Sequence, residues 1–239
     1  MKTNIIYNED FLLNNLDDNS IDLVVTDPPY KTVTGGDSNG SNSERPKGML
    51  QGNRRLFKYQ KLKISDWINQ VYRVLKEESH CYIFTNSLNM EEMLREGKKA
   101  GFKLHNILVW QKQNCTPSQY YMKNCEYVIF FRKGRAKWIN NIGASKTVHE
   151  YLIEDNSMTI SVDNIIGNKL HPCEKPVDLL KFYIENSSNE GSIVLDPFMG
   201  SGSTAIACKE LNRKYIGYEI DKEYYNIINK RIKGDSDGN

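Results

Sequence analysis

The sequence contains no apolar run long enough to span a membrane, and the four residues before its first strand-like segment do not form a signal peptide. We therefore expect a cytoplasmic protein without a membrane span. The five cysteines include no CxxC pair, and neither they nor the four histidines show metal-ligand spacing. These absences argue against a disulfide framework and against a metal site. Several cysteines lie in apolar runs, which predicts core positions.

At 239 residues, with 26% charged and 39% hydrophobic residues, the chain is long enough for one globular domain with a full core. Strand-like and helix-like patterns alternate over most of it. We expect strands at residues 5–7, 21–27, 80–85, 102–110, 125–131, 192–196 and 214–220. Helices are expected at 12–16, 65–75, 87–101, 175–186, 203–211 and 221–233, with Ser65 and Ser87 as N-caps, Pro176 in a first turn and Gly101 as a stop.

This alternation predicts an α/β protein with a doubly wound, mostly parallel sheet that helices cover on both faces. Two stretches show little periodicity. Residues 31–60 are rich in Gly, Ser, Asn, Lys and Arg and predict a long mobile loop, which inside a compact domain is usually a functional lid or a disordered segment. Residues 132–168 are polar and rich in Asn, and we expect a short insertion there in an otherwise single domain, 1–239.

The stretch Thr26-Asp27-Pro28-Pro29-Tyr30 follows the apolar run 21–25, which is typical of a buried strand. Each proline fixes its own backbone and lacks an N–H, so the carbonyl groups are held stiffly between a carboxylate and an aromatic ring. Such a site can accept hydrogen bonds from an exocyclic amino group while the ring stacks on a flat heterocycle. By itself, the stretch is equally well explained as a turn that ends a strand.

A second constellation combines a strand at 192–196, a glycine turn with Gly200 and Gly202, and a helix that begins at Ser203 and Thr204. Nineteen residues after Gly200, at the end of the next strand, Glu219 is placed to hold the hydroxyl groups of a ribose. The turn is neither the GxGxxG of dinucleotide enzymes nor a P-loop with its lysine. Asp196 beside it favours a ligand that joins a ribose to a positive charge, and S-adenosylmethionine fits. The alternative is a turn that binds nothing.

Two basic clusters, at residues 44–63 and 132–138, contain interleaved aromatic residues. Such clusters suit a polyanion whose bases can stack. A single cluster would favour a solvated surface instead, but two clusters favour nucleic acid. Residues 110–114 follow a strand end and are a further candidate, although Trp110 fits the core equally well. The basic residues that we single out are Arg45, Lys47, Arg54, Arg55, Lys58, Lys112, Arg132 and Arg135.

Four motifs occur in one order: Asp27-Pro28-Pro29-Tyr30, His171-Pro172-Cys173-Glu174-Lys175-Pro176, the segment 196–204, and Ile216-Gly217-Tyr218-Glu219. Together they resemble the DNA amino-methyltransferases of the β group. The resemblance extends from Asn4 to Lys233 and is weakest at 31–60 and 132–168. It implies that the insertion at about 132–168 serves target recognition. One departure is Ser203-Thr204, where the family often has Thr-Thr; both pairs carry hydroxyl groups.

The resemblance implies the class I methyltransferase (Rossmann-like) sheet, circularly permuted so that the catalytic strand comes first. It also implies S-adenosylmethionine as cofactor, bound at Asp10, Phe11, Asp27, His171, Lys175, Asp196, Phe198, Gly200, Gly202, Ser203, Thr204 and Glu219. Read locally, His171 could equally be a helix-entry residue and Lys175 a solvated one.

By this resemblance, Asp27 and the carbonyl group of Pro28 would accept hydrogen bonds from the two hydrogens of an exocyclic amino group. Pro29 would hold the turn, and Tyr30 would stack on the base. The target base must be flipped out of double-stranded DNA, and the 31–60 loop would close over it. Asp-Pro-Pro-Tyr favours adenine N6, with cytosine N4 as the nearest rival. An RNA methyltransferase and an inactive nucleic-acid-binding module remain open, as do a homodimer and a cognate restriction endonuclease as partners.

Overall fold

The computed structural model describes residues 1–29, 62–116, 121–143, 145–150 and 175–233. Eight strands in these ranges form one sheet. Each neighbouring pair of strands is parallel except the two pairs that β5 makes with β3 and β4. The spatial order is β1 (Ile5–Tyr7), β8 (Lys214–Tyr218), β7 (Ile193–Asp196), β2 (Ile21–Thr26), β3 (Leu75–Thr85), β5 (Lys123–Arg132), β4 (Lys103–Thr116) and β6 (Val148–Glu150).

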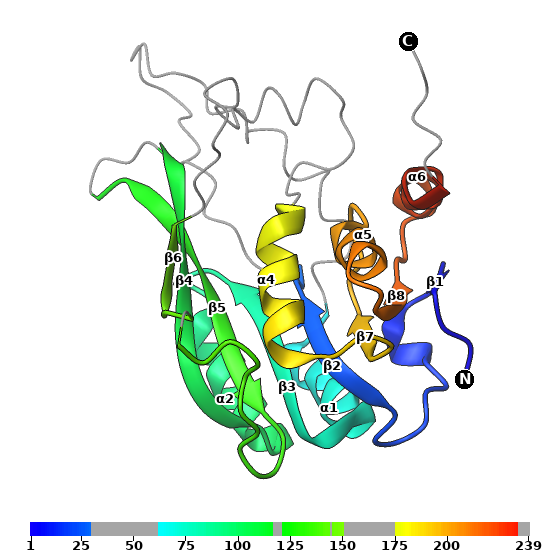
Figure 1. Ribbon diagram of the computed structural model, residues 1–239, viewed down its shortest axis with the longest axis horizontal. Coiled ribbons are helices and arrows are strands. Elements are labelled where there is room, and N and C mark those ends of the chain that lie inside the picture. The colour runs from blue at the N-terminus through cyan, green and yellow to red at the C-terminus, as the bar shows by residue number, and fades with distance from the viewer. Residues whose placement is uncertain (30–61, 117–120, 144, 151–174, 234–239) are drawn as a thin grey trace, which may run out of the picture.

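Helices cover both faces of this sheet, as expected. In Figure 1, α4 (Val177–Ser187), α5 (Ser203–Glu210) and α6 (Lys222–Lys233) lie in front of it, whereas α1 (Ile64–Val74) and α2 (Met90–Ala100) lie behind. A short 3₁₀ helix, η1 (Phe11–Leu13), stands where a weak helix was predicted. The doubly wound, mostly parallel fold predicted from the sequence is therefore confirmed. Among the described helices, none has both the length and the apolarity needed to cross a membrane.

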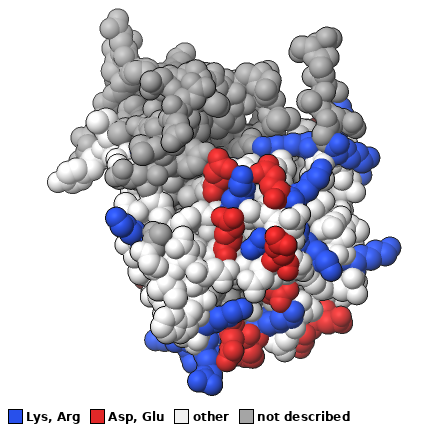
Figure 2. All heavy atoms as spheres, in the orientation of Figure 1, with Lys and Arg blue, Asp and Glu red and all other residues white. Residues whose placement is uncertain are grey.

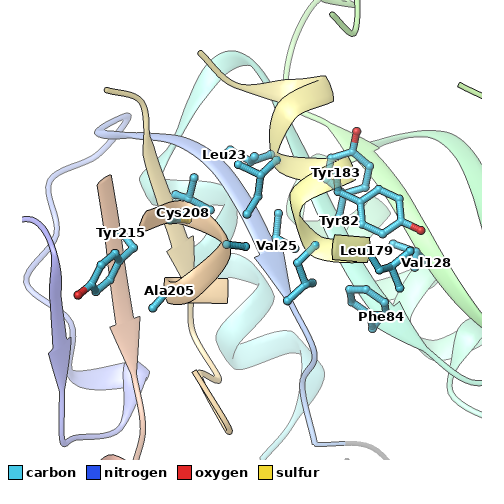
Figure 3. Packing of buried hydrophobic residues seen from close by; sticks show 14 of the residues in the cluster. Leu23, Val25, Tyr82, Phe84, Val128, Leu179, Tyr183, Ala205, Cys208 and Tyr215 are labelled. Carbon is cyan, nitrogen blue, oxygen red and sulfur yellow. The ribbon is translucent and has the colours of Figure 1, made fainter. Parts of the chain in front are cut away.

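The sequence of strand β2 is a continuous apolar run because its alternate side chains enter two different cores, one on each face of the sheet. Leu23 and Val25 point to the face covered by α4, where they pack with Tyr183, whereas Val24 belongs to the core under α1. Figure 3 shows the first of these cores, with Cys208 of α5 among its labelled members. The prediction that cysteines fill core positions is confirmed for Cys208 and for Cys81, both of which are fully buried.

The chain order differs from the spatial order at the centre of the sheet. β7 leads through α5 to β8 on one side, whereas β2 leads through α1 to β3 on the other. β7 and β2 are nonetheless hydrogen-bonded neighbours, with Leu23 paired to Val194. The connections therefore leave these two strands in opposite directions, and ligands of doubly wound sheets bind in the crevice at such a switch point, beyond the carboxyl ends of the strands.

Some element boundaries were predicted wrongly. Ser65 is not an N-cap but lies inside α1, whose cap position is Lys63, and Ser87 precedes α2, whose cap position is Asn89. Strand β3 begins at Leu75, directly after α1, rather than at His80. The strand β6 was not predicted at all, because three residues give no measurable period and the strand exists only through its pairing with β4.

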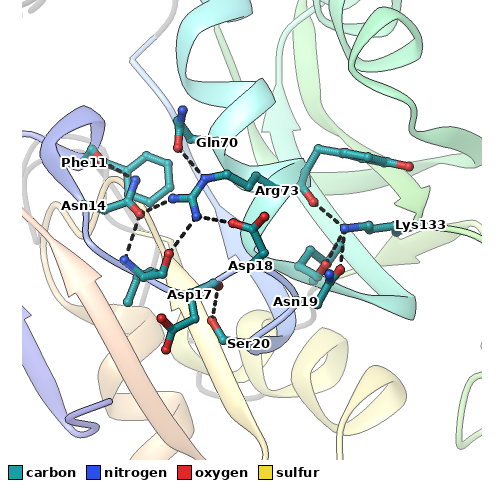
Figure 4. Close-up of polar contacts among 12 residues, drawn as sticks. Phe11, Asn14, Asp17, Asp18, Asn19, Ser20, Gln70, Arg73 and Lys133 are labelled. Carbon is teal, nitrogen blue, oxygen red and sulfur yellow. Dashed lines mark hydrogen bonds and ion pairs between the residues drawn. The ribbon is translucent and has the colours of Figure 1, made fainter.

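The edge of the sheet where β2 begins is fastened by two buried or half-buried cations (Figure 4). Arg73 of α1 donates to the carbonyl oxygen of Leu16 at 2.7 Å and to the carboxylate of Asp18 at 2.6 Å. Lys133, which is 5% exposed, donates to Asn19 and to two carbonyl oxygens at the end of α1, each at 2.8 Å. These contacts stabilise the end of the sheet that lies away from the carboxyl ends of the parallel strands.

Candidate active site

The carboxyl ends of β2, β7 and β8 carry Asp27, Asp196 and Glu219 at one edge of the sheet. Neighbouring strands are spaced by about 4.8 Å, so the strand ends that carry Asp27 and Glu219 are separated by two strand spacings, or about 10 Å. The two constellations predicted from separate parts of the sequence therefore meet at this edge, on either side of Asp196.

Asp196 is 3% exposed and joins three elements. Its Oδ1 accepts hydrogen bonds from the hydroxyl of Thr26 at 2.7 Å and from the N–H of Phe198 at 3.0 Å, and its Oδ2 accepts one from the hydroxyl of Thr204 at 2.7 Å. Burial raises the pKa of Asp196 to about 6, although these three donors oppose the rise. Its carboxylate is thus directed at β2 and α5, and its role toward a cofactor stays a prediction.

The glycine turn places its backbone around Glu219. Gly200 has a φ of +53° and Gly202 a φ of +84°, both in the left-handed region that favours glycine. The N–H of Gly200 donates to Oε2 of Glu219 at 2.9 Å. The hydroxyls of Ser203 and Thr204 are engaged within the protein, by Ser201 at 3.0 Å and by Asp196. A ligand at this turn would therefore meet backbone groups rather than these hydroxyls.

We expect Gly202→Ala to weaken cofactor binding and to lower stability by more than the about 1–2 kcal/mol that backbone strain alone costs an L residue at this φ. Its new Cβ would also lie 2.7 Å from Cγ2 of Ile228. Gly191→Ala is the matched control, because Gly191 has a φ of +78° and open space around it, so it reports the backbone strain alone. Urea denaturation measures both variants. Equal stability losses, with cofactor binding unchanged in Gly202→Ala, would contradict a special role for this turn.

Glu219 is half-buried and accepts two backbone hydrogen bonds, from Gly200 and from Asp221 at 2.8 Å. Burial raises the pKa of Glu219 to about 7, against the opposing effect of these two N–H groups. A carboxylate has about four acceptor positions. Glu219 therefore retains the capacity to accept from two further hydroxyl groups once it is ionised.

A chain of alternating charges lies on the other side of Asp196. The ammonium group of Lys175 is 2.5 Å from Oδ2 of Asp27 and 3.3 Å from Oε2 of Glu126, and Oε1 of Glu126 accepts from Lys112. The Lys175 side chain is only 7% exposed and lies 5.3 Å from the centre of the Phe84 ring. Strands β4 and β5 and the segments that follow β2 and precede α4 thus contribute to one chain of two acids and two bases.

Asp27 uses only one of its two oxygens in this chain. Its Oδ1 is shielded from solvent and has no hydrogen-bond partner among the described residues. Burial raises the pKa of Asp27, with Lys175 opposing the rise and Glu126 adding to it. Burial alone would also raise the pKa of Glu126, but Lys175 and Lys112 hold it below its usual range. An acceptor buried without a donor is costly, so Oδ1 is available to a hydrogen-bond donor from outside the described residues.

Other predicted cofactor residues lie at the same edge with their side chains packed. Asp10 caps η1, since its Oδ1 accepts from the N–H of Leu12 at 2.9 Å. Phe11 is 2% exposed and packs edge-on against Tyr218, with 5.2 Å between the ring centres. Phe198 packs in the same way on Trp67 at 5.3 Å. Their predicted contacts with a cofactor remain predictions.

The structure does not bring Arg132 and Arg135 together with Asp27. Because β5 is antiparallel to β3, it begins near the edge of the sheet that carries Asp27, where Glu126 lies, and ends with Arg132 at the opposite edge. Six residues at about 3.4 Å each separate Glu126 from Arg132 by about 20 Å. The segment after it is fixed there, since Nε2 of His80 donates to the carbonyl oxygen of Lys137 at 3.1 Å. Within the described residues, these two arginines are thus separate from the site, and a contact with nucleic acid would have to occur elsewhere on the surface.

Lys112 does lie at the site, but its ammonium group is paired with Glu126 and stands 5.0 Å from the ring of Trp110. Trp110 is 7% exposed and belongs to the core, which decides between its two predicted roles. On the face that α4, α5 and α6 cover, acidic and basic side chains are interspersed (Figure 2). Lys181, for example, pairs with Asp178 and Glu210. The described residues of this face therefore carry charges of both signs.

Several predicted residues lie outside the described ranges: Tyr30, Arg45, Lys47, Arg54, Arg55, Lys58 and His171. The predicted loop 31–60 and part of the 132–168 insertion lie outside them too. In the part of the chain that is described, no three His, Cys, Asp or Glu side chains are grouped as a metal site requires.

Sequence reasoning missed Glu126 and Thr26. Glu126 had a signal, because it is the only charged residue in the run 125–131, between a cysteine and a tyrosine at the entry of an apolar strand. A charge at such a position is costly unless it is paired. Thr26 gave no usable signal, since a threonine at the end of a strand is ordinary and only the neighbouring β7 gives it a partner.

Comparison with known proteins identifies the class. A family model described as DNA methylase matches residues 21–230. The chain therefore belongs to this family of DNA N6/N4 amino-methyltransferases, and its sheet is of the class I methyltransferase type, permuted so that the Asp27 strand precedes the glycine-turn strand.

Two relatives and two solved structures illustrate the similarity. The chain is 31% identical to the Type II methyltransferase M.HpaI of Haemophilus parainfluenzae over 95% of this chain and 72% of the relative. It is 28% identical to M2.DpnII of Streptococcus pneumoniae, over 98% and 91%. The crystal structure of an M1.HpyAVI–SAM complex aligns with a TM-score of 0.66 and 26% identity, over 95% of this chain and 98% of that one. The cytosine-N4-specific PvuII DNA methyltransferase has the same fold, with a TM-score of 0.66 at 20% identity over 96% and 92%.

Proposed function

We propose that this protein transfers a methyl group from S-adenosylmethionine to the exocyclic N6 of an adenine that is flipped out of double-stranded DNA. The observation that carries the proposal is the open Oδ1 of Asp27, a shielded acceptor without a partner among the described residues, at the edge of the sheet where the glycine turn and Glu219 also lie. Family membership and the similarity to a SAM complex support the cofactor.

The chemistry that this geometry supports is activation by hydrogen bonding. The lone pair of an exocyclic amino group is delocalised into the ring, which makes the nitrogen a poor nucleophile. Asp27 and the carbonyl group of Pro28 accept hydrogen bonds from its two N–H groups. The nitrogen thereby becomes more tetrahedral, and its lone pair is no longer delocalised into the ring. S-adenosylmethionine supplies an electrophilic methyl group when bound. The nitrogen would take this methyl group as its bond to the sulfonium sulfur breaks, which leaves a neutral thioether, and it would release one proton to solvent. The rate gain would come from positioning and preorganised electrostatics.

The residues at the glycine turn support the orientation of the cofactor. Glu219 would accept from the ribose hydroxyls, and the glycine turn would hold its carboxylate in place, since the N–H of Gly200 donates to Oε2 of Glu219. The methionine end would then point along the strand ends toward Asp27. His171 and Lys175, which the family resemblance assigns to that end, belong to this proposal as well.

The decisive experiment incubates the purified protein with methyl-labelled S-adenosylmethionine and mixed-sequence duplex DNA, then digests the DNA and separates the nucleosides. We expect the label in N6-methyl-2′-deoxyadenosine. Label in N4-methylcytosine would keep the fold and the activation chemistry but replace the base. If cofactor binds and DNA stays unlabelled, labelled RNA would indicate an RNA methyltransferase, and no label on either would indicate an inactive binding module.

The partners follow from the same proposal. Duplex DNA is the substrate, the protein acts in the cytoplasm, and similarity to Type II methyltransferases supports a cognate restriction endonuclease as partner. A homodimer is a separate prediction, which sedimentation of the purified protein tests. Deleting part of the 31–60 loop is expected to weaken DNA binding far more than cofactor binding. Equal losses of both would contradict a role for the loop over the DNA.

A further inference from the structure

We propose that Glu126 is a positioning residue, which holds the ammonium group of Lys175 on one oxygen of Asp27 and thereby keeps the other oxygen open for the substrate amino group. This inference rests on the proposed function, because an open oxygen on Asp27 matters to catalysis only when an amino group is delivered to it.

The first step of the argument is the reach of Lys175. Its flexible four-carbon stem carries a compact ammonium group with three donors. Paired with Asp27 alone, such a group would be free to bridge both carboxylate oxygens and so compete with the substrate. In the structure it instead lies between two carboxylates: it donates a hydrogen bond to Oδ2 of Asp27 at 2.5 Å and forms an ion pair, without a hydrogen bond, with Oε2 of Glu126 at 3.3 Å. The second carboxylate draws it to one side.

The second step is the rigidity of Glu126. It lies on β5, where its neighbour Tyr127 pairs in register with Thr85 of β3 and Val109 of β4, so the backbone is fixed from both sides. Its other oxygen is occupied by Lys112. The Glu126 side chain is 17% exposed and that of Lys175 is 7% exposed, so solvent does little to screen the pair. Glu126 is therefore a fixed anchor and Lys175 the group that it holds.

The third step is the balance of charge around Asp27. The charged groups that face it are Lys175 before α4, Glu126 on β5, Lys112 on β4 and Asp196 on β7. Lys175 favours the ionised form of Asp27, whereas Glu126 opposes it. Removing Glu126 must therefore lower the pKa of Asp27, and removing Lys175 must raise it. A residue with a merely structural role would move neither.

The test compares Glu126→Gln with Lys175→Met in the full-length protein. The titration of the Asp27 carboxyl group is followed by NMR of carbon-labelled aspartate, with Asp27→Asn to assign the signal. We expect a downward shift for Glu126→Gln and an upward shift for Lys175→Met, with the acid limb of kcat/KM for DNA moving in the same directions. In Glu126→Gln we also expect kcat to fall about 10- to 100-fold, because a misplaced group near the reacting atoms costs that much, while cofactor affinity is unchanged.

The controls are Glu96→Gln and Lys181→Met, which remove matching charges on α2 and α4, away from the chain of charges at Asp27.

Glu126→Asp keeps the charge but retracts it by one methylene, so the titration of Asp27 should stay near that of the unaltered protein while kcat falls. This variant replaces Glu126→Gln if the latter does not fold. An unshifted Asp27 titration in folded Glu126→Gln, or an unchanged kcat in Glu126→Asp, would overturn the inference. Absence of methyl transfer by the unaltered protein would instead overturn the proposed function, since the NMR titration needs no activity.

Discussion

Asp27→Asn is expected to lower the rate of methyl transfer to DNA by about 10²- to 10³-fold, the loss typical of removing one preorganised hydrogen-bonding group from an active site. The substituted amide replaces an acceptor by an N–H donor, which cannot bind an amino hydrogen. It also leaves Lys175 beside a neutral group. Single-turnover measurements with labelled cofactor report the chemical step directly.

The matched control for this experiment is Asp66→Asn, an exposed aspartate in the first turn of α1. It removes the same charge away from the site and should leave the rate unchanged. Because Asp27 is also a predicted cofactor contact, cofactor binding to Asp27→Asn is measured separately and the transfer rate is compared at saturating cofactor. If Asp27→Asn methylates DNA at the rate of Asp66→Asn, the proposed role of Asp27 is wrong.

Glu219→Gln is expected to weaken cofactor binding by about 10- to 100-fold, which corresponds to the 1.5–3 kcal/mol typical of hydrogen bonds to a charged group. Glutamine keeps one acceptor oxygen but turns an N–H group toward one of the two backbone donors, Gly200 and Asp221. Isothermal titration with S-adenosylmethionine measures the change. Glu223→Gln, at an exposed glutamate on α6, is the control.

The same residue predicts a pH dependence. The pKa of Glu219 in the free protein is raised to about 7 by burial. Only the ionised carboxylate can accept from both ribose hydroxyls, so affinity should be complete above pH 7 and fall as the pH drops through that value. Between pH 8 and pH 6 we expect a decrease of about tenfold. Glu219→Gln should remove this dependence, and a tenfold decrease that persists in Glu219→Gln would assign it to another group.

Local patterns in the sequence were enough to predict most of the fold. Apolar runs of β-branched residues predict the central strands because both faces of a parallel sheet are buried, and β2 shows this directly. The glycine turn and the acid nineteen residues later are likewise local or nearly local features. Helix caps were less predictable, since Ser65 and Ser87 suit a cap chemically but the chain begins α1 and α2 elsewhere.

The sequence by itself therefore determined the class of sheet and the positions of Asp27 and Glu219 at the ends of their strands. Only the tertiary structure decided which charges surround Asp27. Lys175 and Glu126 are separated from it by 148 and about 100 residues, respectively, and no pattern with a period of two or 3.6 residues reports such a contact. The direction of β5 was likewise decided only by the tertiary structure. Because β5 is antiparallel to β3, Glu126 lies at the site and Arg132 lies at the opposite edge of the sheet. Strand direction is set by pairing with neighbours that lie far away in the chain, which is why sequence proximity to an active-site residue is a poor guide to proximity in space.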